Sequence, residues 1–261
     1  AGCSRRGPRP RRSAWSSTMR RVIFLAAAAT LLAGCAGTAD PSGTWINQAA
    51  IDAASKDGKL REALLAYGPN LEWKLDSKAG EATFSNGFEL GEGTLSKSDD
   101  EHWKVAFYGD DNQESLELDG KELIQQASAN GPEQRFRRLD PQPAANSPAG
   151  SGFERALYGS YLKGSWKIRE GQGQGGKVEF QANGLVSGLP GAERYALCLA
   201  GDCAAMSGDN DSIWLQQGNR GRELLFSLDD DELQLFEAVN TAGANEMPSY
   251  VPGKRVWLLE R

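Results

Sequence analysis

Histidine and cysteine are scarce in this chain, which holds one histidine and four cysteines in 261 residues. The single histidine, His102, argues against a zinc site with several histidine ligands and against a Ser-His-Asp mechanism. Four cysteines are too few to hold a chain of this length together, so its one or two domains must bury hydrophobic cores. The apolar stretch at residues 22–32 has 11 residues, too few for a helix to cross about 30 Å of hydrocarbon.

A secretory signal follows Met19, the first methionine of the chain. Two arginines give it a positive start, the apolar stretch gives it a core, and small residues precede Cys35, which are the three parts of a signal peptide. We therefore expect residues 19–34 to be removed on export. Residues 1–18 are expected to be a non-native extension upstream of the true start.

The end of this signal, Leu32-Ala33-Gly34-Cys35, resembles the lipobox of bacterial lipoproteins. The resemblance implies that Cys35 becomes the mature N-terminus and carries a thioether-linked diacylglycerol and an N-acyl chain. Several acyl chains anchor a protein to a membrane stably, whereas a single chain is marginal. In that family an Asp after the Cys marks retention at the inner membrane, so Ala36 implies the periplasmic face of the outer membrane. The alternative is a plain secretory signal without an anchor.

The charge that remains after removal of the signal is strongly negative. The first 34 residues hold seven arginines and no acidic residue, which leaves 22 basic against 35 acidic residues and a formal charge of −13. Such a charge repels phosphate backbones, and no stripe of Lys or Arg offsets it. We expect no nucleic-acid partner.

Two cysteines remain in the exported part, Cys198 and Cys203. An oxidising compartment favours a disulfide between them. A two-residue turn at Ala200-Gly201 would place them opposite each other in a β-hairpin, within disulfide range. We therefore predict a disulfide that pins a local hairpin.

An internal repeat organises the rest of the chain. Gly43-Thr44-Trp45 opens one half and Gly164-Ser165-Trp166 opens the other, and each opening is followed by a Phe with an Asn-Gly pair, at Phe84 and at Phe180. Alternation of apolar and polar residues between Gly, Asn and Asp turns predicts antiparallel strands in both halves. The fold is expected to be all-β, with two small antiparallel barrels or sandwiches in tandem.

The first module is expected to carry one helical insertion. Leu60, Ala63, Leu64 and Tyr67 follow helical spacing, which predicts a helix near residues 48–67. The predicted parts of the chain are a tether at 35–42, a first β module at 43–140, a Pro/Ala/Ser/Gly linker at 141–157 and a second β module at 158–261.

The Gly-x-Trp opening and the arginines of the closing strand resemble the lipocalin-like domains of bacterial envelope proteins. In lipocalins that Trp closes the base of the barrel and stacks on a late Arg. The resemblance implies that Trp45 meets Arg135 or Arg137, and that Trp166 meets Arg255, each as a cation–π contact worth about 0.5 to 2 kcal/mol.

No catalytic or metal-binding arrangement emerges from the sequence. His102 lies in an acidic turn, where carboxylates favour its protonated form, and the other carboxylate runs are typical of solvated turns. We therefore expect a non-enzymatic protein without a cofactor, which binds an envelope protein or supports the envelope. Two alternatives stay open: a carrier of a lipid or small apolar ligand in one barrel, and an inhibitor of a periplasmic hydrolase that inserts the loop between Cys198 and Cys203.

Overall fold

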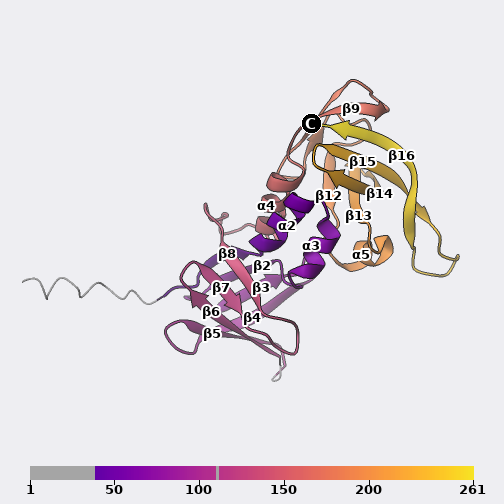
Figure 1. Cartoon of the computed structure of the whole chain (residues 1–261). Helices are drawn as coiled ribbons and strands as arrows, with labels where there is room; N and C mark the ends of the chain where they lie inside the picture. Colours follow the sequence, from indigo (N-terminus) through magenta and orange to yellow (C-terminus); the bar gives the residue numbers. More distant parts are fainter. Residues whose placement is uncertain (1–38, 110–111) are drawn as a thin grey trace, which may run out of the picture. The chain divides into compact units, whose positions relative to one another are not determined.

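A closed eight-stranded antiparallel barrel forms the first half of the computed structural model, which describes residues 39–109 and 112–261 (Figure 1). Each strand pairs with the next along the chain, and β8 returns to pair with β1. The strands are β1 (Gly43–Ile46), β2 (Glu72–Asp76), β3 (Glu81–Ser85), β4 (Leu90–Lys97), β5 (His102–Phe107), β6 (Gln113–Asp119), β7 (Glu122–Gln125) and β8 (Gln134–Arg138). The prediction of a small antiparallel barrel is confirmed for the first module.

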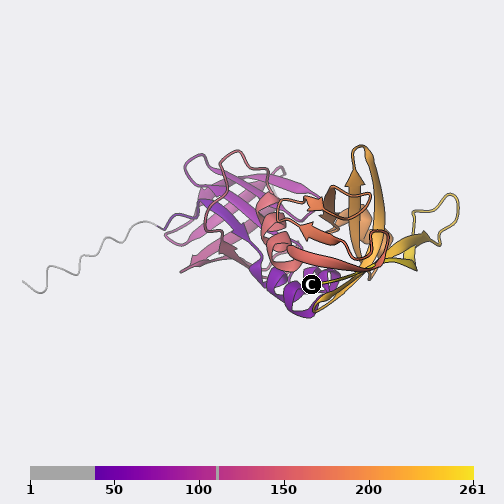
Figure 2. The ribbon, with the colours of Figure 1, turned by 90° about the horizontal axis from the view of Figure 1, so that it is seen from above.

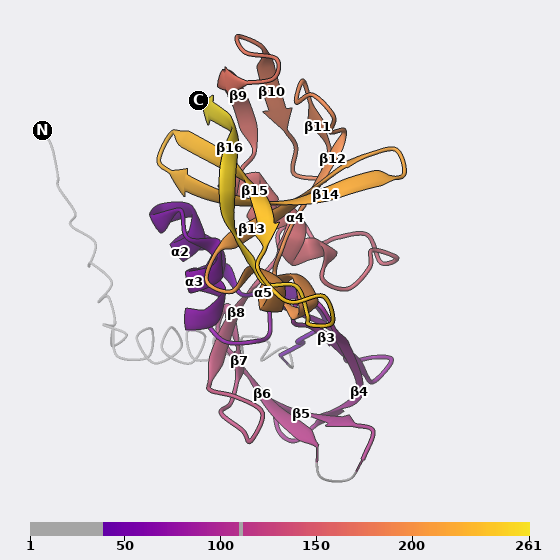
Figure 3. The same ribbon diagram turned by 90° about the vertical axis from the view of Figure 1, so that its right-hand side faces the viewer.

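The first barrel fills its interior with its own side chains. Strands β3 to β8 curve round the barrel in Figure 3. Every second residue of a strand points inward, and these residues form one apolar cluster in which each is 5% exposed or less. Its members are Trp45, Trp73, Leu75, Ala82, Leu95, Trp103, Val105, Leu116, Leu123 and Phe136.

The helical insertion between β1 and β2 is confirmed, but it forms two helices, α2 (Gln48–Asp57) and α3 (Leu60–Ala66), where the sequence predicted one. The break is at Gly58, whose φ of 70° is left-handed and whose N–H bonds to the carbonyl of Ala54. The backbone of Leu228 lies against it, because a Cβ at Gly58 would come within 2.1 Å of the Leu228 carbonyl oxygen. A close approach to the second module thus ends the first of the two helices.

The predicted linker at 141–157 is wrong in its second half. Helix α4 (Ser151–Tyr161) begins inside it, and Phe153, Leu157, Tyr158 and Tyr161 form its buried face at helical spacing. The part without regular secondary structure, residues 141–150, is called the strap from here on. The second module therefore begins with a helix that the Pro- and Gly-rich composition upstream obscured.

The second half of the chain is an eight-stranded antiparallel sheet in the order β11-β10-β9-β16-β15-β14-β13-β12. The strands are β9 (Gly164–Gly171), β10 (Lys177–Phe180), β11 (Val186–Ser187), β12 (Arg194–Leu197), β13 (Asp211–Gln217), β14 (Arg220–Asp229), β15 (Glu232–Asn240) and β16 (Tyr250–Glu260), with helix α5 (Gly201–Ser207) between β12 and β13. A single bridge, Leu185 to Arg194, spans the break between β11 and β12. The cyclic order of strands is that of the first barrel, interrupted at this one position, which we call the seam.

The core of the second module includes the helices of the first. One apolar cluster joins the inward faces of β9 to β16 to helices α2, α3 and α4. The helical members include Ile51, Ala54, Leu60, Leu64, Phe153 and Leu157, and the strand members include Ile168, Phe180, Leu197, Ile213, Leu224, Leu235 and Leu259. Residues 39–261 accordingly form a single compact unit, and the two modules share one hydrophobic core at their junction.

The internal repeat is present in the structure, with one correction. Gly43 and Gly164, which begin the opening strands, have φ values of 131° and 132°. Phe84 lies on the third strand of its module and Phe180 on the second, so these two residues are not equivalent, although the sequence aligned them. The strand that corresponds to β10 in the first module is β2.

The hairpin of β15 and β16 extends past the rest of its sheet and is yellow in Figures 1 and 2. Its outer part, from Ala238 paired with Pro252 to Asn240 paired with Tyr250, pairs only within the hairpin. Strand β14 pairs with β15 as far as Glu237. Both edges of the outer hairpin are therefore without a neighbouring strand among the described residues.

Candidate functional site

In each module an arginine lies over the tryptophan of the opening strand. The Arg138 guanidinium lies 5.7 Å from the centre of the Trp45 ring, and the Arg261 guanidinium lies 4.4 Å from the centre of the Trp166 ring. In both modules the indole N–H donates to the carbonyl four residues earlier, at 2.7 Å to Pro41 and 3.0 Å to Leu162. A late arginine meets the opening tryptophan in each repeat, as the resemblance implied, but through other arginines than those named.

Arg135 and Arg137 do not contact Trp45 because they point outward. They alternate with the buried Gln134 and Phe136, and Arg135 pairs instead with Glu122 at 3.2 Å. Arg138 has the inward parity of the strand and lies directly opposite Trp45. The predicted pairs of Trp45 with Arg135 or Arg137 are therefore wrong by one step of the strand alternation.

Arg255 does not contact Trp166 because it lies too far along its strand. Strands β16 and β9 pair with Glu260 opposite Lys167, which leaves Arg261 next to Trp166. Arg255 lies beyond the part of β16 that pairs with β9, and it forms an ion pair with Glu170. The predicted contact is wrong because the sequence did not reveal the register of these strands.

The disulfide between Cys198 and Cys203 is confirmed, with a Cα–Cα distance of 5.9 Å. The predicted hairpin is wrong, because Cys203 lies in helix α5 and Gly201 begins that helix. Leu199, between the cysteines, is 5% exposed and packs against Gly87 of the first module. The bond thus fixes α5 to the end of β12, and the loop it closes is partly buried.

Two carboxylates link the modules, because each caps a helix that belongs in sequence to the other module. Asp211 of β13 accepts the backbone N–H groups of Leu60 and Arg61, at 3.0 and 2.6 Å, at the start of α3. Glu72 of β2 accepts that of Phe153 at 2.8 Å at the start of α4. These N–H groups would otherwise lack partners. Neither cap could be predicted from the sequence, because each joins residues far apart in the chain.

Burial raises the pKa of both capping carboxyls. The pKa of Glu72 lies above its ordinary value because burial outweighs its backbone hydrogen bonds, and the same holds for Asp211. Glu154, one turn into α4, also has a raised pKa, chiefly from burial and then from the charge of Glu72. The junction of the modules is therefore a place where acidic groups resist ionisation.

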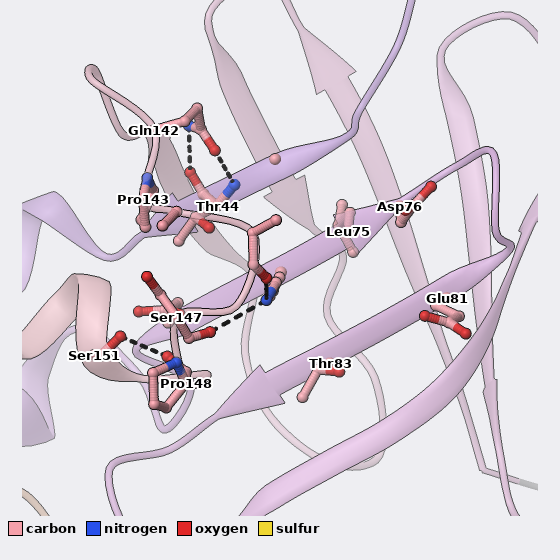
Figure 4. A pocket seen from close by; sticks show the side chains of 15 residues that line it. Thr44, Leu75, Asp76, Glu81, Thr83, Gln142, Pro143, Ser147, Pro148 and Ser151 are labelled. Atoms are coloured by element: carbon pink, nitrogen blue, oxygen red, sulfur yellow. Dashed lines mark hydrogen bonds between the residues drawn. The ribbon is translucent and has the colours of Figure 1, made fainter.

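A cleft of about 370 Å³ lies between the strap and the outer face of β1 to β3 (Figure 4). Gln142 of the strap makes two hydrogen bonds to the backbone of Thr44, and Lys74 donates to the carbonyls of Ala145 and Ser147. Thr83 and Glu81 line the other side. Several polar groups of this strap cleft are thus already used to hold the strap in place.

A second cavity, of about 830 Å³, lies at the end of the first barrel where Trp45 and Arg138 meet. Its lining holds basic and acidic side chains together, namely Lys121, Arg137, Arg138, Asp40, Glu122 and Asp140. This barrel base is also where the chain enters the first strand. The mixed charge gives no preference for an anionic or a cationic ligand.

The remaining candidate groups are carboxylates and the single histidine. These residues hold no group of three or more His, Cys, Asp or Glu that could bind a metal ion. His102 Nδ1 lies 2.7 Å from an oxygen of Asp99, and this contact raises the pKa of the exposed imidazole. Asp211, part of an acidic run in the sequence, is used as a helix cap.

The predicted lipidation residue Cys35, the signal peptide and the first half of the tether, residues 35–38, lie outside the described residues. In the part of the chain that is described, no helix is long and apolar enough to cross a bilayer. Comparisons with protein-family models, with curated proteins and with solved structures found no significant match to this chain.

Proposed function

We propose that this protein is an outer-membrane lipoprotein, anchored through Cys35 on the periplasmic face, with a non-enzymatic role in binding an envelope partner or supporting the envelope. The observation that carries the proposal is the Leu32-Ala33-Gly34-Cys35 motif at the end of an 11-residue apolar stretch. The disulfide between Cys198 and Cys203 supports export to an oxidising compartment.

The point where the chain enters the barrel base limits how far the barrel can lie from an anchored Cys35. Asp40 accepts hydrogen bonds from the hydroxyl groups of Ser42 and Ser77, at 2.7 and 2.8 Å, so the chain is fixed to the barrel from this residue on. Five peptide steps from Cys35 to Asp40 span at most about 17 Å. An acylated Cys35 would therefore hold the barrel base close to the bilayer.

The non-enzymatic role is supported by the way polar groups are used in the strap cleft. Lys74 and Gln142 hold the strap, and Glu72 caps a helix. The carrier alternative gains no support, because inward side chains fill the first barrel. The inhibitor alternative rested on a projecting hairpin, whereas Leu199 in that loop is buried.

The anchor is tested by expressing the full chain in a Gram-negative host fed an alkyne-tagged fatty acid. Wild type should be labelled and sediment with the outer membrane, and Cys35→Ser should lose both properties. Cys3→Ser, which lies before the signal, is the matched control and should behave as wild type. Ala36→Asp should keep the label and move to the inner membrane. Persistent labelling of Cys35→Ser would refute the anchor.

The binding role is tested by recovery of the tagged protein from detergent-solubilised envelope, with proteins and lipids both identified by mass spectrometry. A protein recovered in a fixed ratio supports the proposed role. A lipid recovered without any protein contradicts it and favours the carrier alternative.

A further inference from the structure

The seam of the second module borders a small cavity whose lining differs from that of the strap cleft. The cavity has a volume of about 210 Å³ and lies where α4, the loop after β10, β12 and β13 meet. Its lining includes Glu154, Asn183, Arg194, Trp214 and Gln216. Pockets that enclose a drug-sized molecule have volumes of about 300 to 1,000 Å³. This cavity is smaller, so its size suits one small ring.

Trp214 is a large aromatic side chain on the outer face of the sheet, and it is 42% exposed. Its neighbour on β12 is Ala196, which is too small to cover it. On the other side the indole lies against Gly221, where a Cβ would come within 2.2 Å of the ring. Glu223 is paired with Trp214 on β14. Because Ala196 and Gly221 are both small, the Trp214 ring keeps an exposed surface beside the cavity.

The polar groups of this cavity are not consumed by the fold. Among the hydrogen bonds and ion pairs of the described residues, the side chains of Glu154 and Arg194 have no partner, and neither does the Trp214 indole N–H. Gln216 uses its amide nitrogen to bond the Gly218 carbonyl at 2.8 Å, which leaves its oxygen available. The contrast with Lys74 in the strap cleft, which donates to two backbone carbonyls, is direct.

The chemistry of these groups selects among ligands. A phosphate would meet the Glu154 carboxylate and a simple cation would meet the Arg194 guanidinium, so the site disfavours either charge alone. A wholly apolar ligand would remove these groups from water without replacing their hydrogen bonds. Two classes remain, a zwitterion and a neutral ring with donors and acceptors at its edge. The exposed face of Trp214 favours the ring, because C–H groups on the face of a ring are attracted to an aromatic face.

We propose that the seam cavity binds one ring of a neutral saccharide, with the sugar face on Trp214 and its hydroxyl groups on Glu154, Arg194 and Gln216. Glycosidases generally need a pair of carboxylates, and Glu154 is the one carboxylate among the described residues that line this cavity. The site therefore binds the sugar without cleaving it. The inference rests on the proposed binding role but not on the anchor.

The test is titration of the full chain carrying Cys35→Ser with maltotriose, cellobiose and chitotriose, followed by ligand-observed NMR and calorimetry. At least one saccharide should bind with a Kd of about 1 mM or tighter. Trp214→Ala should weaken that binding at least about tenfold, and Glu154→Gln and Arg194→Gln should each weaken it less. Tyr108→Ala, an exposed aromatic residue of the first module, is the matched control and should leave the Kd unchanged.

All variants must retain the thermal unfolding midpoint of the parent protein, which separates loss of binding from loss of folding. The proposal is overturned if none of the saccharides binds up to about 10 mM. It is also overturned if Trp214→Ala binds as well as the parent, or if alanine displaces the sugar, which would identify a zwitterion site. Because Cys35 is replaced throughout, failure of the anchor has no effect on this result.

Discussion

The two β modules share one cyclic order of strands and complete their cores in different ways. The first barrel closes between β1 and β8 and fills its interior with residues of its own strands. The second is interrupted between β11 and β12, and its core includes α2 and α3, which belong to the first module in sequence. A strand pattern can thus repeat along a chain while the cores it builds are not independent.

The helix caps at the junction also show that the two modules depend on each other. Asp211 of the second module holds the start of α3, and Glu72 of the first holds the start of α4. Tyr161 adds a hydrogen bond of 2.6 Å from its hydroxyl to the Gly58 carbonyl. Each module therefore caps a helix that belongs in sequence to the other module. Because α2 and α3 also pack in the core of the second module, we expect them to depend energetically on it.

The largest expected effect comes from Leu60→Ala. Leu60 is 1% exposed in the shared core, and such a truncation costs about 2 to 5 kcal/mol. Hydrogen exchange should show faster exchange in β9 to β16 and in α2 and α3, with little change in β1 to β8. Leu65→Ala, on the same helix but 64% exposed, is the control and should change stability little. Faster exchange confined to the first barrel would contradict the assignment of Leu60 to the core of the second module.

Removal of the disulfide should cost less. Its loop is short, because the cysteines are separated by five positions, and the chain-entropy model gives about 2 kcal/mol. Cys198→Ser with Cys203→Ser should lower the thermal midpoint of the full chain and increase exchange first in α5. Reduction of the wild type should give the same midpoint. An equal loss of protection in the first barrel would contradict a local role.

A pH effect of moderate size follows from the raised pKa of Asp211. A carboxyl whose pKa is higher in the folded state stabilises the fold most when protonated, and this contribution falls as pH rises from the unfolded to the folded pKa. The wild type should therefore lose more stability than Asp211→Asn in denaturant titrations as the pH rises above the ordinary aspartate pKa of about 3.9. Other titrating groups are common to both proteins and cancel in the difference. Parallel curves would show that the pKa of Asp211 is the same in the folded and unfolded states.

The smallest expected effect is at the tryptophan–arginine contacts that the modules have in common. Arg138→Lys and Arg261→Lys should each cost about 0.5 to 1 kcal/mol, since Lys is a weaker partner for an aromatic face. Arg135→Lys and Arg255→Lys, which replace arginines away from the tryptophans, serve as controls for the charge-preserving change. Equal unfolding midpoints for all four variants would show that the tryptophan–arginine contacts do not contribute to stability.

The sequence predicted the local features of this fold well. The alternation of apolar and polar residues predicted strands in both modules, and the spacing of Leu60 and Leu64 predicted the helical insertion. Cys198 and Cys203 were paired because they are the two cysteines of the exported part. These features depend on neighbours along the chain or on a single pairing. The helical spacing also identified an apolar face, but it did not tell which module that face would cover.

Other features depended on registers and on contacts between distant segments. The tryptophan partners were misassigned because the side of the strand on which Arg137 lies, and the position of Arg255 along β16, are set by pairing with other strands. The cap by Asp211 could not be predicted, because Asp211 and Leu60 are 151 positions apart in the chain. The seam cavity could not be predicted, because Glu154 and Trp214 meet only when the sheet curves to bring β12 and β13 next to α4.

Native-state hydrogen exchange of the intact wild-type chain tests the central claim most directly, because it reports the free energy of opening for each segment. The account predicts that residues 48–66, which form α2 and α3, exchange with the opening free energy and denaturant dependence of β9 to β16. The result that would contradict it is exchange of α2 and α3 together with β1 to β8, while β9 to β16 stay protected.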